Sequence, residues 1–291
     1  MKKITFAVIL VVIIGLLIFF FTKDSKPEEV VITPDTSEES EEVASGRVEI
    51  EEQDTKADGK TVIGTSVEGK EIVAYHYGDL EAEKELLFIG GIHGSYSRNT
   101  VTLANELRDY FEESNNVIPE GYVATVIPVM NPDGFEKASV SQSIEGRFNA
   151  NDVDLNRNFD CQWSSTSKWK EQTVSGGSSA FSEPEAEAVR DYFAANQIEG
   201  VVVYYAAAGG VFASSCSDAV MSETSALTNA YADASGYEAF ESFDFYEITG
   251  DMVNWFAKNN IPAISVLLSG YESAEFSKNK AGVDAFFNYY N

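Results

Sequence analysis

The sequence is poor in basic residues, in histidine and in cysteine. Its 20 Lys and Arg residues stand against 47 Asp and Glu residues, which gives a formal net charge of −27 at pH 7. A surface with this excess of negative charge repels the phosphates of nucleic acids and anionic lipids, so neither is an expected partner. The acidity is typical of an exposed, soluble domain, and it is also compatible with a preference for cationic ligands.

The chain has two histidines, His76 and His93, and two cysteines, Cys161 and Cys216. A catalytic zinc site needs three protein ligands and an open position for water, and one imidazole with a stray carboxylate falls short of that set. Outside the cytoplasm the two cysteines can form a disulfide that closes a loop of about 55 residues. Two unpaired, buried thiols are the alternative.

Charge is absent from residues 4–22, which are almost entirely Ile, Leu, Val and Phe. A helix of this length spans about 28 Å and matches a bilayer core. Lys2 and Lys3 precede it, so the sequence predicts a single-pass anchor over residues 1–23 with a cytoplasmic N-terminus and an extracytoplasmic domain at the cell membrane. A cleaved signal peptide is the alternative, although the apolar run is long and lacks a small-residue cleavage site.

Aromatic residues are absent from residues 24–58, which are rich in Glu, Asp, Ser, Thr and Pro. Such a segment cannot bury enough apolar area to offset its chain entropy, and it is expected to be an acidic, disordered linker. From residue 59 to 291, apolar runs of strand length at 86–89, 122–130, 201–205 and 261–268 alternate with helical patterns. One helix is expected over 99–114. Another is expected from a capping box at 182–185 to about residue 196.

This alternation predicts one α/β domain with a mostly parallel, mixed sheet flanked by helices. In such sheets a ligand site lies beyond the carboxyl ends of the strands. Several motifs lie in or near the loops expected there: 64–70, 91–94, 131–135, 154–159, 182–185, and 246–251 followed by Trp255. In this order the set resembles the zinc metallocarboxypeptidases of the carboxypeptidase A and B type, in particular their compact bacterial members.

The resemblance implies a zinc ion held by His and Glu of a His-x-x-Glu loop and by a second His, with a Glu as general base. Only His93 stands at such a position in this chain. Tyr96 replaces the Glu ligand, Ala206 is the best match to the second His, and Leu267 occupies the place of the base. We therefore expect no catalytic residues and no metal cofactor, with His93 a vestige of the metal site.

The residues that bind carboxylate in this family are retained. The resemblance assigns Arg147 to oxyanion stabilisation, Asn156 and Arg157 to the terminal carboxylate of a peptide, and Tyr246 to the mobile Tyr that closes over the substrate. Val253 would face the terminal side chain and favour an apolar one. Asp251 lies close enough in sequence to favour a cationic side chain instead, and the sequence leaves both open.

Three functions follow from these residues. The first is an inactive receptor for peptides with a free C-terminal carboxylate, with cell-wall stem peptides as candidates. The second is a structural or partner-binding module. The third is an active zinc carboxypeptidase with a rearranged site, in which case zinc is the cofactor. The retained Arg147, Asn156, Arg157 and Tyr246 favour the first.

Overall fold

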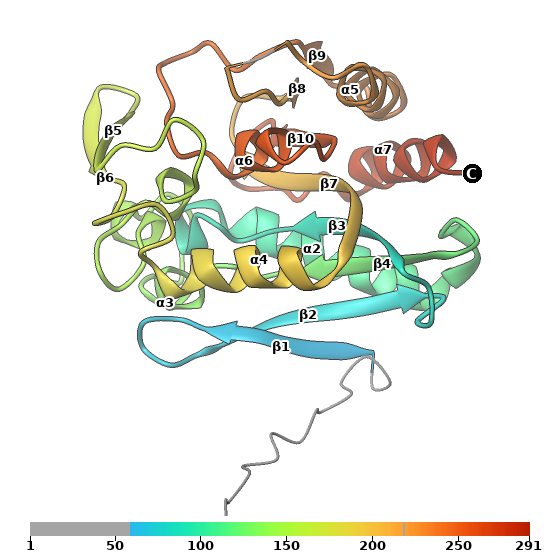
Figure 1. Ribbon diagram of the computed structural model, residues 1–291, viewed down its shortest axis with the longest axis horizontal. Helices are drawn as coiled ribbons and strands as arrows, with labels where there is room; N and C mark the ends of the chain where they lie inside the picture. The colour runs from blue at the N-terminus through green and yellow to red at the C-terminus, as the bar shows by residue number, and fades with distance from the viewer. Residues whose placement is uncertain (1–58, 218) are drawn as a thin grey trace, which may run out of the picture. The chain divides into compact units, whose positions relative to one another are not determined.

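An eight-stranded sheet runs through the part of the chain that the computed structural model describes, residues 59–217 and 219–291 (Figure 1). The predicted anchor and linker lie outside the described residues. Within the described ranges, no helix is long and apolar enough to cross a membrane. The strand order is β1-β2-β4-β3-β7-β10-β8-β9. The strands are β1 Lys60–Thr65, β2 Glu71–Gly78, β4 Tyr122–Ile127, β3 Lys84–Ile89, β7 Gln197–Ala206, β10 Ala263–Leu268, β8 Gly210–Ala213 and β9 Glu238–Phe240.

The centre of the sheet is parallel, and this confirms the predicted α/β class. Strands β4, β3, β7 and β10 pair in parallel, whereas β1 and β2 are antiparallel additions at one side and β8 runs antiparallel to β10. All four predicted strands are present. Their central residues are buried on both faces, as expected for near-continuous apolar runs. A separate hairpin is formed by β5 Thr166–Trp169 and β6 Gln172–Ser175.

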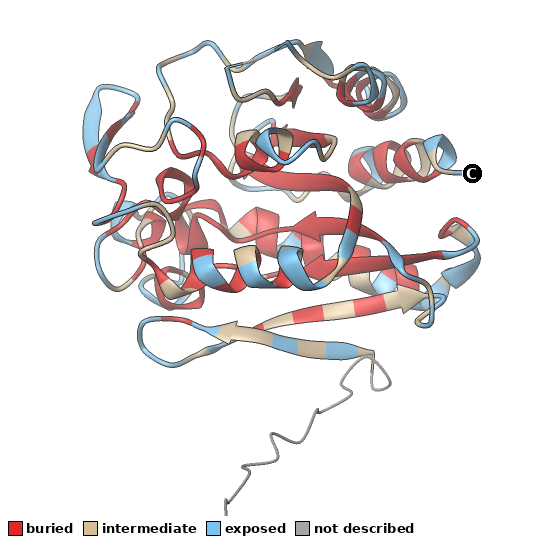
Figure 2. Ribbon diagram, in the orientation of Figure 1, coloured by how far each residue is buried: buried red, intermediate tan, exposed pale blue. Residues whose placement is uncertain are grey.

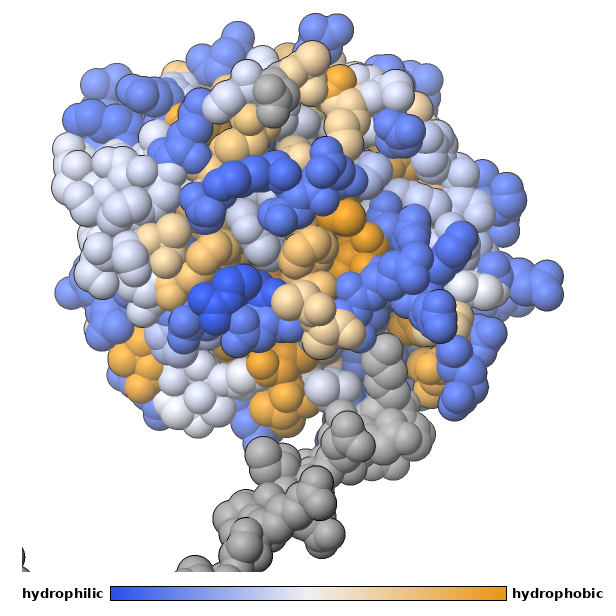
Figure 3. All heavy atoms as spheres, in the orientation of Figure 1, coloured by the Kyte–Doolittle hydropathy of each residue, from blue (hydrophilic) through white to orange (hydrophobic). Residues whose placement is uncertain are grey.

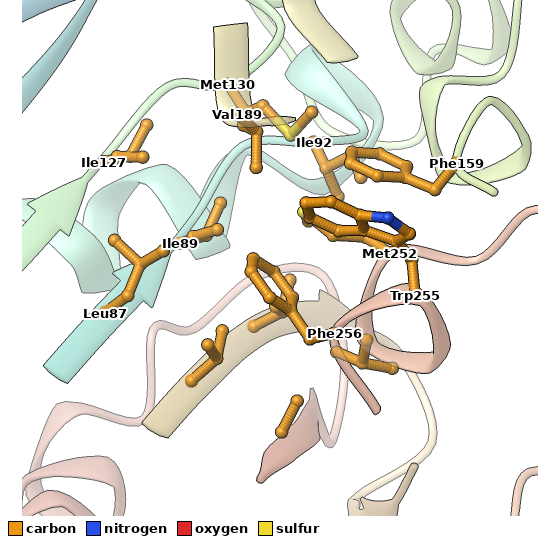
Figure 4. Packing of buried hydrophobic residues seen from close by; sticks show 14 of the residues in the cluster. Leu87, Ile89, Ile92, Ile127, Met130, Phe159, Val189, Met252, Trp255 and Phe256 are labelled. Atoms are coloured by element: carbon orange, nitrogen blue, oxygen red, sulfur yellow. The ribbon is translucent and has the colours of Figure 1, made fainter. Parts of the chain in front are cut away.

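Helices cover both faces of the sheet (Figure 1). Helices α4 (Pro184–Ala195) and α6 (Met252–Lys258) pack on one face, with a core that includes Trp255 and Phe256 (Figure 4). Helices α2 (Arg98–Glu113), α5 (Ser222–Ser235) and α7 (Phe276–Tyr289) pack on the other. The remaining helical segments are short: η2 Gly94–Ser97, η3 Asn115–Val117, α3 Pro132–Glu136, η4 Ile144–Arg147 and η5 Leu155–Arg157.

Burial is greatest in the central strands, while β1 alternates between exposed and half-buried positions (Figure 2). Hydrophilic side chains dominate the face drawn in Figure 3, and smaller apolar areas lie between them. This pattern fits the strongly acidic composition.

The predicted capping box at the start of α4 is wrong. The N-cap residue is Glu183, and no side chain caps the helix. Glu185 is wholly buried and accepts a hydrogen bond from Asn149 Nδ2 (3.1 Å), while the Ser182 hydroxyl donates to Glu183 (2.8 Å). The backbone amide of Glu183 donates to Asn158 Oδ1 (3.1 Å). In a capping box, the side chains of Ser182 and Glu185 would bind backbone amides at the start of the helix. Here they accept hydrogen bonds from Asn158 and Asn149, and so connect residues 149–158 to α4.

Cys161 and Cys216 form a disulfide, with their Cα atoms 5.8 Å apart and a sequence separation of 55. The sequence had left this pairing open. The bond joins the segment after η5 to the segment after β8, and a hydrogen bond from Gln162 to the Ser217 hydroxyl (2.6 Å) runs beside it. On the chain-entropy argument, a cross-link over a loop of this length contributes about 4 kcal/mol to the free energy of unfolding.

The turn between β10 and α7 is fastened by the carboxylate of Glu275, which accepts hydrogen bonds from the Ser269 amide (2.7 Å), the Ser269 hydroxyl (2.9 Å) and the Tyr237 hydroxyl (2.8 Å). Burial acts to raise the pKa of Glu275, but these bonds outweigh it and lower the pKa to about 2. Because the folded-state pKa is the lower one, this stabilisation is present above about pH 4.5 and is lost as the pH falls toward 2.

We therefore expect Glu275→Gln to lower the free energy of unfolding by about 1–2 kcal/mol at pH 7. The same variant should show a shallower loss of stability than the parent between pH 4.5 and 2. Urea denaturation at several pH values measures both effects. A variant that loses stability as steeply as the parent over this range would contradict the assignment.

Candidate functional site

A cavity of about 680 Å³ opens at the carboxyl ends of β7 and β10, where the sequence predicted a site. Most of the predicted site residues line it: His93, Arg147, Asn156, Arg157, Ala206, Tyr246, Asp251, Val253 and Leu267. The loop after β4 was also expected to contribute, but none of its residues lines the cavity. Asn131 caps α3, and Asp133 accepts a hydrogen bond from the Ser66 hydroxyl (2.7 Å). The side chains of this loop are therefore bound to other segments of the chain.

Arg147 and Asp154 form a buried ion pair in the site. The Nε and Nη2 atoms of Arg147 donate to Asp154 Oδ2 at 2.9 and 2.7 Å, and both side chains are almost fully buried. Burial would raise the pKa of Asp154, but the Arg147 charge holds it well below its usual range. The guanidinium also lies over the Trp169 ring, 4.5 Å from its centroid. Arg147 is thus held rigidly, and much of its charge is neutralised within the protein.

Arg157 differs from Arg147 because its guanidinium contacts no carboxylate. Its Nε and Nη2 donate to the carbonyl oxygen of Lys168 (3.1 and 2.9 Å), and Nη1 donates to the carbonyl oxygen of Asn156 (2.6 Å). In residues 59–217 and 219–291 it forms no ion pair, although it is 1% exposed. Asp154 and Asp251 act on this charge only at longer range, and no carboxylate among the described residues contacts it, so the guanidinium can receive an anionic ligand.

Asn156 lies beside Arg157, but its side chain is already engaged. Its Nδ2 donates to Asp251 Oδ2 (2.7 Å), and its Oδ1 accepts from the Tyr205 hydroxyl (3.1 Å) and the Met252 amide (3.2 Å). Asp251 is the N-cap of α6, with Oδ1 accepting from the Asn254 amide (3.1 Å). These bonds position Asn156, and each carboxylate oxygen of Asp251 accepts one hydrogen bond.

His93 follows β3 and is 5% exposed. Neither ring nitrogen has a hydrogen-bond partner, and Nε2 lies 3.6 Å from Asp154 Oδ1, too far for a hydrogen bond. Burial and then the Arg147 charge lower the pKa of His93 to about 4, so the imidazole is neutral at pH 7. Its ring packs against that of Tyr205, with centroids 5.6 Å apart. The second histidine, His76, lies 2.9 Å from the hydroxyls of both Thr61 and Thr125 and does not line the cavity.

Because side chains alternate between the two faces of a sheet, successive residues near the ends of β7 and β10 lie on opposite faces. Tyr205 and Leu267 are paired across the two strands and belong to the same core cluster. Ala206 packs against the core on the opposite face of the sheet, although it also lines the cavity. The side chain that reaches His93 from this part of β7 is therefore that of Tyr205.

Tyr96 belongs to an aromatic cluster beside the cavity. Its ring meets those of Trp169 and Tyr271 edge-on, each at a centroid distance of 5.2 Å, and its hydroxyl lies 3.0 Å from that of Tyr271. Trp169 and Tyr271 line the cavity, whereas Tyr96 does not. Tyr246 lines the cavity and packs against this cluster and against Phe243.

The donor set does not fit the zinc ion that the resemblance implies. His93 is the only imidazole in the cavity, and Tyr96, Tyr205, Ala206 and Leu267 supply neither a carboxylate nor a second imidazole. No group of three or more His, Cys, Asp or Glu side chains in the described ranges is placed to hold a metal ion. Proton transfer from a metal-bound water also has no base at Leu267.

The sequence alone did not identify four side chains of the site: Asp154, Trp169, Tyr205 and Tyr271. Asp154 stands two residues before Asn156, within a motif that the sequence did single out. Tyr205 could have been found from the period-two alternation of its strand. Nothing in the local sequence distinguishes Trp169 or Tyr271, which reach the cavity from a short hairpin and from a turn.

The fold and the position of the cavity define a carboxypeptidase-like α/β domain. The zinc carboxypeptidase pattern matches residues 51–278, and the chain belongs to this family. The catalytic chain of human carboxypeptidase N is 34% identical over 113 residues, which cover 33% of this chain and 25% of that protein. Mouse carboxypeptidase D is 34% identical over 114 residues, 35% of this chain and 8% of that protein. The matched segment thus spans a quarter or less of these relatives.

Solved structures share the fold. A murein-tripeptide amidase from Escherichia coli O157 superposes with a TM-score of 0.59 at 21% identity, covering 78% of this chain and 90% of that one. Bovine thrombin-activatable fibrinolysis inhibitor, solved in complex with tick carboxypeptidase inhibitor, gives a TM-score of 0.64 at 17% identity, covering 78% of this chain and 86% of that one.

Proposed function

We propose that this protein is a receptor for peptides with a free C-terminal carboxylate and does not hydrolyse them. The observation that carries the proposal is Arg157, a buried guanidinium that lines the cavity, donates to two backbone carbonyl oxygens and contacts no carboxylate among the described residues. A carboxylate is the ligand group that best matches this charge and geometry. Arg147 lies in the same cavity but is paired with Asp154, so it contributes orientation more than net charge. Active zinc carboxypeptidase chemistry is the alternative, and chelator-sensitive peptide trimming by the unmodified protein would establish it.

We further propose that the terminal side chain is apolar. Asp251 is 5% exposed and burial raises its pKa, which weakens its fit to a cationic terminal side chain. Val253 and Leu267 line the cavity. The aromatic residues Phe212 and Phe243, whose rings contact each other, line it as well. An apolar residue buried there gains about 25 cal/mol for each Å² of apolar surface removed from water.

The proposal includes the membrane. We place the domain outside the cell, held by the apolar segment 4–22, because that run follows two lysines and precedes an acidic stretch. Cell-wall stem peptides are then available ligands. The likeness of the fold to a murein-tripeptide amidase supports this choice, since that enzyme's name places its substrate in the cell wall.

A peptide ending in leucine with a free carboxylate is expected to bind about 100-fold more tightly than the same peptide amidated at its C-terminus. A desolvated pair between a carboxylate and Arg157 accounts for this difference. Isothermal titration of the full chain in detergent measures both affinities. Arg157→Gln should remove most of the difference, because the variant keeps polar contacts and loses the charge.

Arg190 supplies the matched control, because it is a partly exposed arginine on α4 outside the cavity and is paired with Glu187 and Asp191. Arg190→Gln should leave the preference for the free carboxylate intact. Thermal unfolding of both variants shows whether the domain is folded. Equal affinities of the parent protein for the free and amidated peptides would favour the structural module instead.

A further inference from the structure

We propose that the mouth of the cavity selects peptides that carry a lysine side chain shortly before their free C-terminus. We call Glu171, Asp244 and Glu247 the acidic mouth, because all three line the cavity and are exposed. The inference rests on the proposed function, since it takes the terminal carboxylate to lie at Arg157. It adds the chemical class of the residues upstream.

The acidic mouth is built from two separate segments. Glu171 lies in the turn between β5 and β6, whereas Asp244 and Glu247 lie between β9 and α6, and both segments run along the same side of the molecule (Figure 1). In the described part of the chain, none of the three carboxylates forms an ion pair. Lys170 is the one exposed basic side chain among the described lining residues, so the mouth keeps a net negative charge.

Charge therefore changes sign along the depth of the cavity. At the inner end Arg157 is buried with no carboxylate in contact among the described residues, and the buried Asp251 acts on it at longer range, whereas three carboxylates are exposed at the outer end. A ligand with the opposite polarity fits both ends, with an anionic group inside and a cationic group outside. An extended peptide rises by about 3.3 Å per residue, so moving a lysine from one to three residues before the C-terminus shifts it outward in steps of about that length.

His93 gives an independent reason to expect a ligand in this cavity. Its imidazole is 5% exposed, lines the cavity, and has no hydrogen-bond partner at either nitrogen. Buried polar atoms are rarely left unpaired in folded proteins. A neutral imidazole can donate from one nitrogen and accept at the other, which suits the amide groups of a peptide.

The test uses acetylated tetrapeptides that end in leucine, with lysine or glutamate placed one, two or three residues before it. Each peptide is made with a free and with an amidated C-terminus, and binding to the full chain in detergent is titrated. At the best of the three positions, the free lysine peptide is expected to bind about tenfold more tightly than the glutamate peptide at low salt. The preference should fall to about twofold in 1 M salt, where the Debye length is about 3 Å.

The variant Glu171→Gln, Asp244→Asn, Glu247→Gln should abolish the lysine preference while the preference for a free carboxylate remains. The matched control neutralises Glu83, Glu113 and Glu120, three exposed carboxylates outside the cavity, and should keep both preferences. Equal binding of lysine and glutamate peptides, with amidation still harmful, would overturn the acidic mouth alone. Equal binding of free and amidated lysine peptides would overturn the receptor proposal, and with it the inference as stated.

Discussion

Replacing Arg147 with methionine is expected to lower the free energy of unfolding by about 3–5 kcal/mol. The substitution removes both hydrogen bonds to Asp154 Oδ2 and leaves a carboxylate that is 0% exposed without its cation. Methionine retains much of the volume, so the loss reports the unpaired charge more than a cavity. Urea denaturation followed by far-UV circular dichroism measures the change.

The loss should also depend on pH. In the parent protein the pKa of Asp154 lies well below its usual range, so its stabilisation is present at neutral pH and is lost only in strong acid. Lys258→Met is the matched control, because Lys258 pairs with Asp160 at a similar distance (2.8 Å) but at the surface. That variant should lose less than about 1 kcal/mol. Equal losses in the two variants would show that the buried pair contributes no more than a surface pair.

The second large effect concerns zinc. The double variant Tyr96→Glu, Tyr205→His is expected to bind zinc about 100-fold more tightly than Tyr96→Glu, Ala206→His. Both add one carboxylate and one imidazole to His93. However, Tyr205 packs against the His93 ring, whereas Ala206 packs on the opposite face of the sheet. Competition with a chelating dye measures the two affinities, and equal affinities would contradict the placement of Tyr205 as the residue that reaches His93.

Neither double variant is expected to trim peptides, because Leu267 cannot accept a proton from water. Adding Leu267→Glu to the Tyr205→His variant supplies the missing base, and chelator-sensitive release of a C-terminal residue would then be measurable. The unmodified protein is the control. If it retains one equivalent of zinc through dialysis and trims peptides in a chelator-sensitive manner, the receptor proposal is wrong and the alternative of an active enzyme holds.

The buried strands were predictable from the sequence because each contains a continuous run of apolar and aromatic residues of strand length. Residues 86–89 and 201–205 are examples, and both fall within parallel strands at the centre of the sheet. The β5–β6 hairpin was not predicted, because it is short and mostly polar and buries only alternate residues. The capping box failed for another reason. Its sequence pattern is local, but Glu185 and Ser182 are engaged by partners from distant segments.

The site was partly predictable. The sequence predicted that Arg147, Asn156 and Arg157 lie in one site at the carboxyl ends of the strands. All three line the cavity found there. The sequence could not show that Asn156 is held by Asp251 or that Arg147 is neutralised by Asp154, since those partnerships depend on side-chain geometry. The assignment of Ala206 illustrates a general limit. In a strand, a shift of one residue moves a side chain to the opposite face.

The disulfide between Cys161 and Cys216 adjoins residues that line the cavity, so its redox state bears on the geometry of the cavity. Cys161 is followed by Gln162 and Cys216 lies between Ser215 and Ser217, and these three neighbours all line the cavity. Such a bond forms and persists only in an oxidising compartment. A molecule retained in a reducing one would keep its buried sheet but lose the tether between two sides of its own pocket. On the proposed function and location, ligand affinity would therefore depend on oxidation of Cys161 and Cys216, and the reduced protein should bind its ligand more weakly.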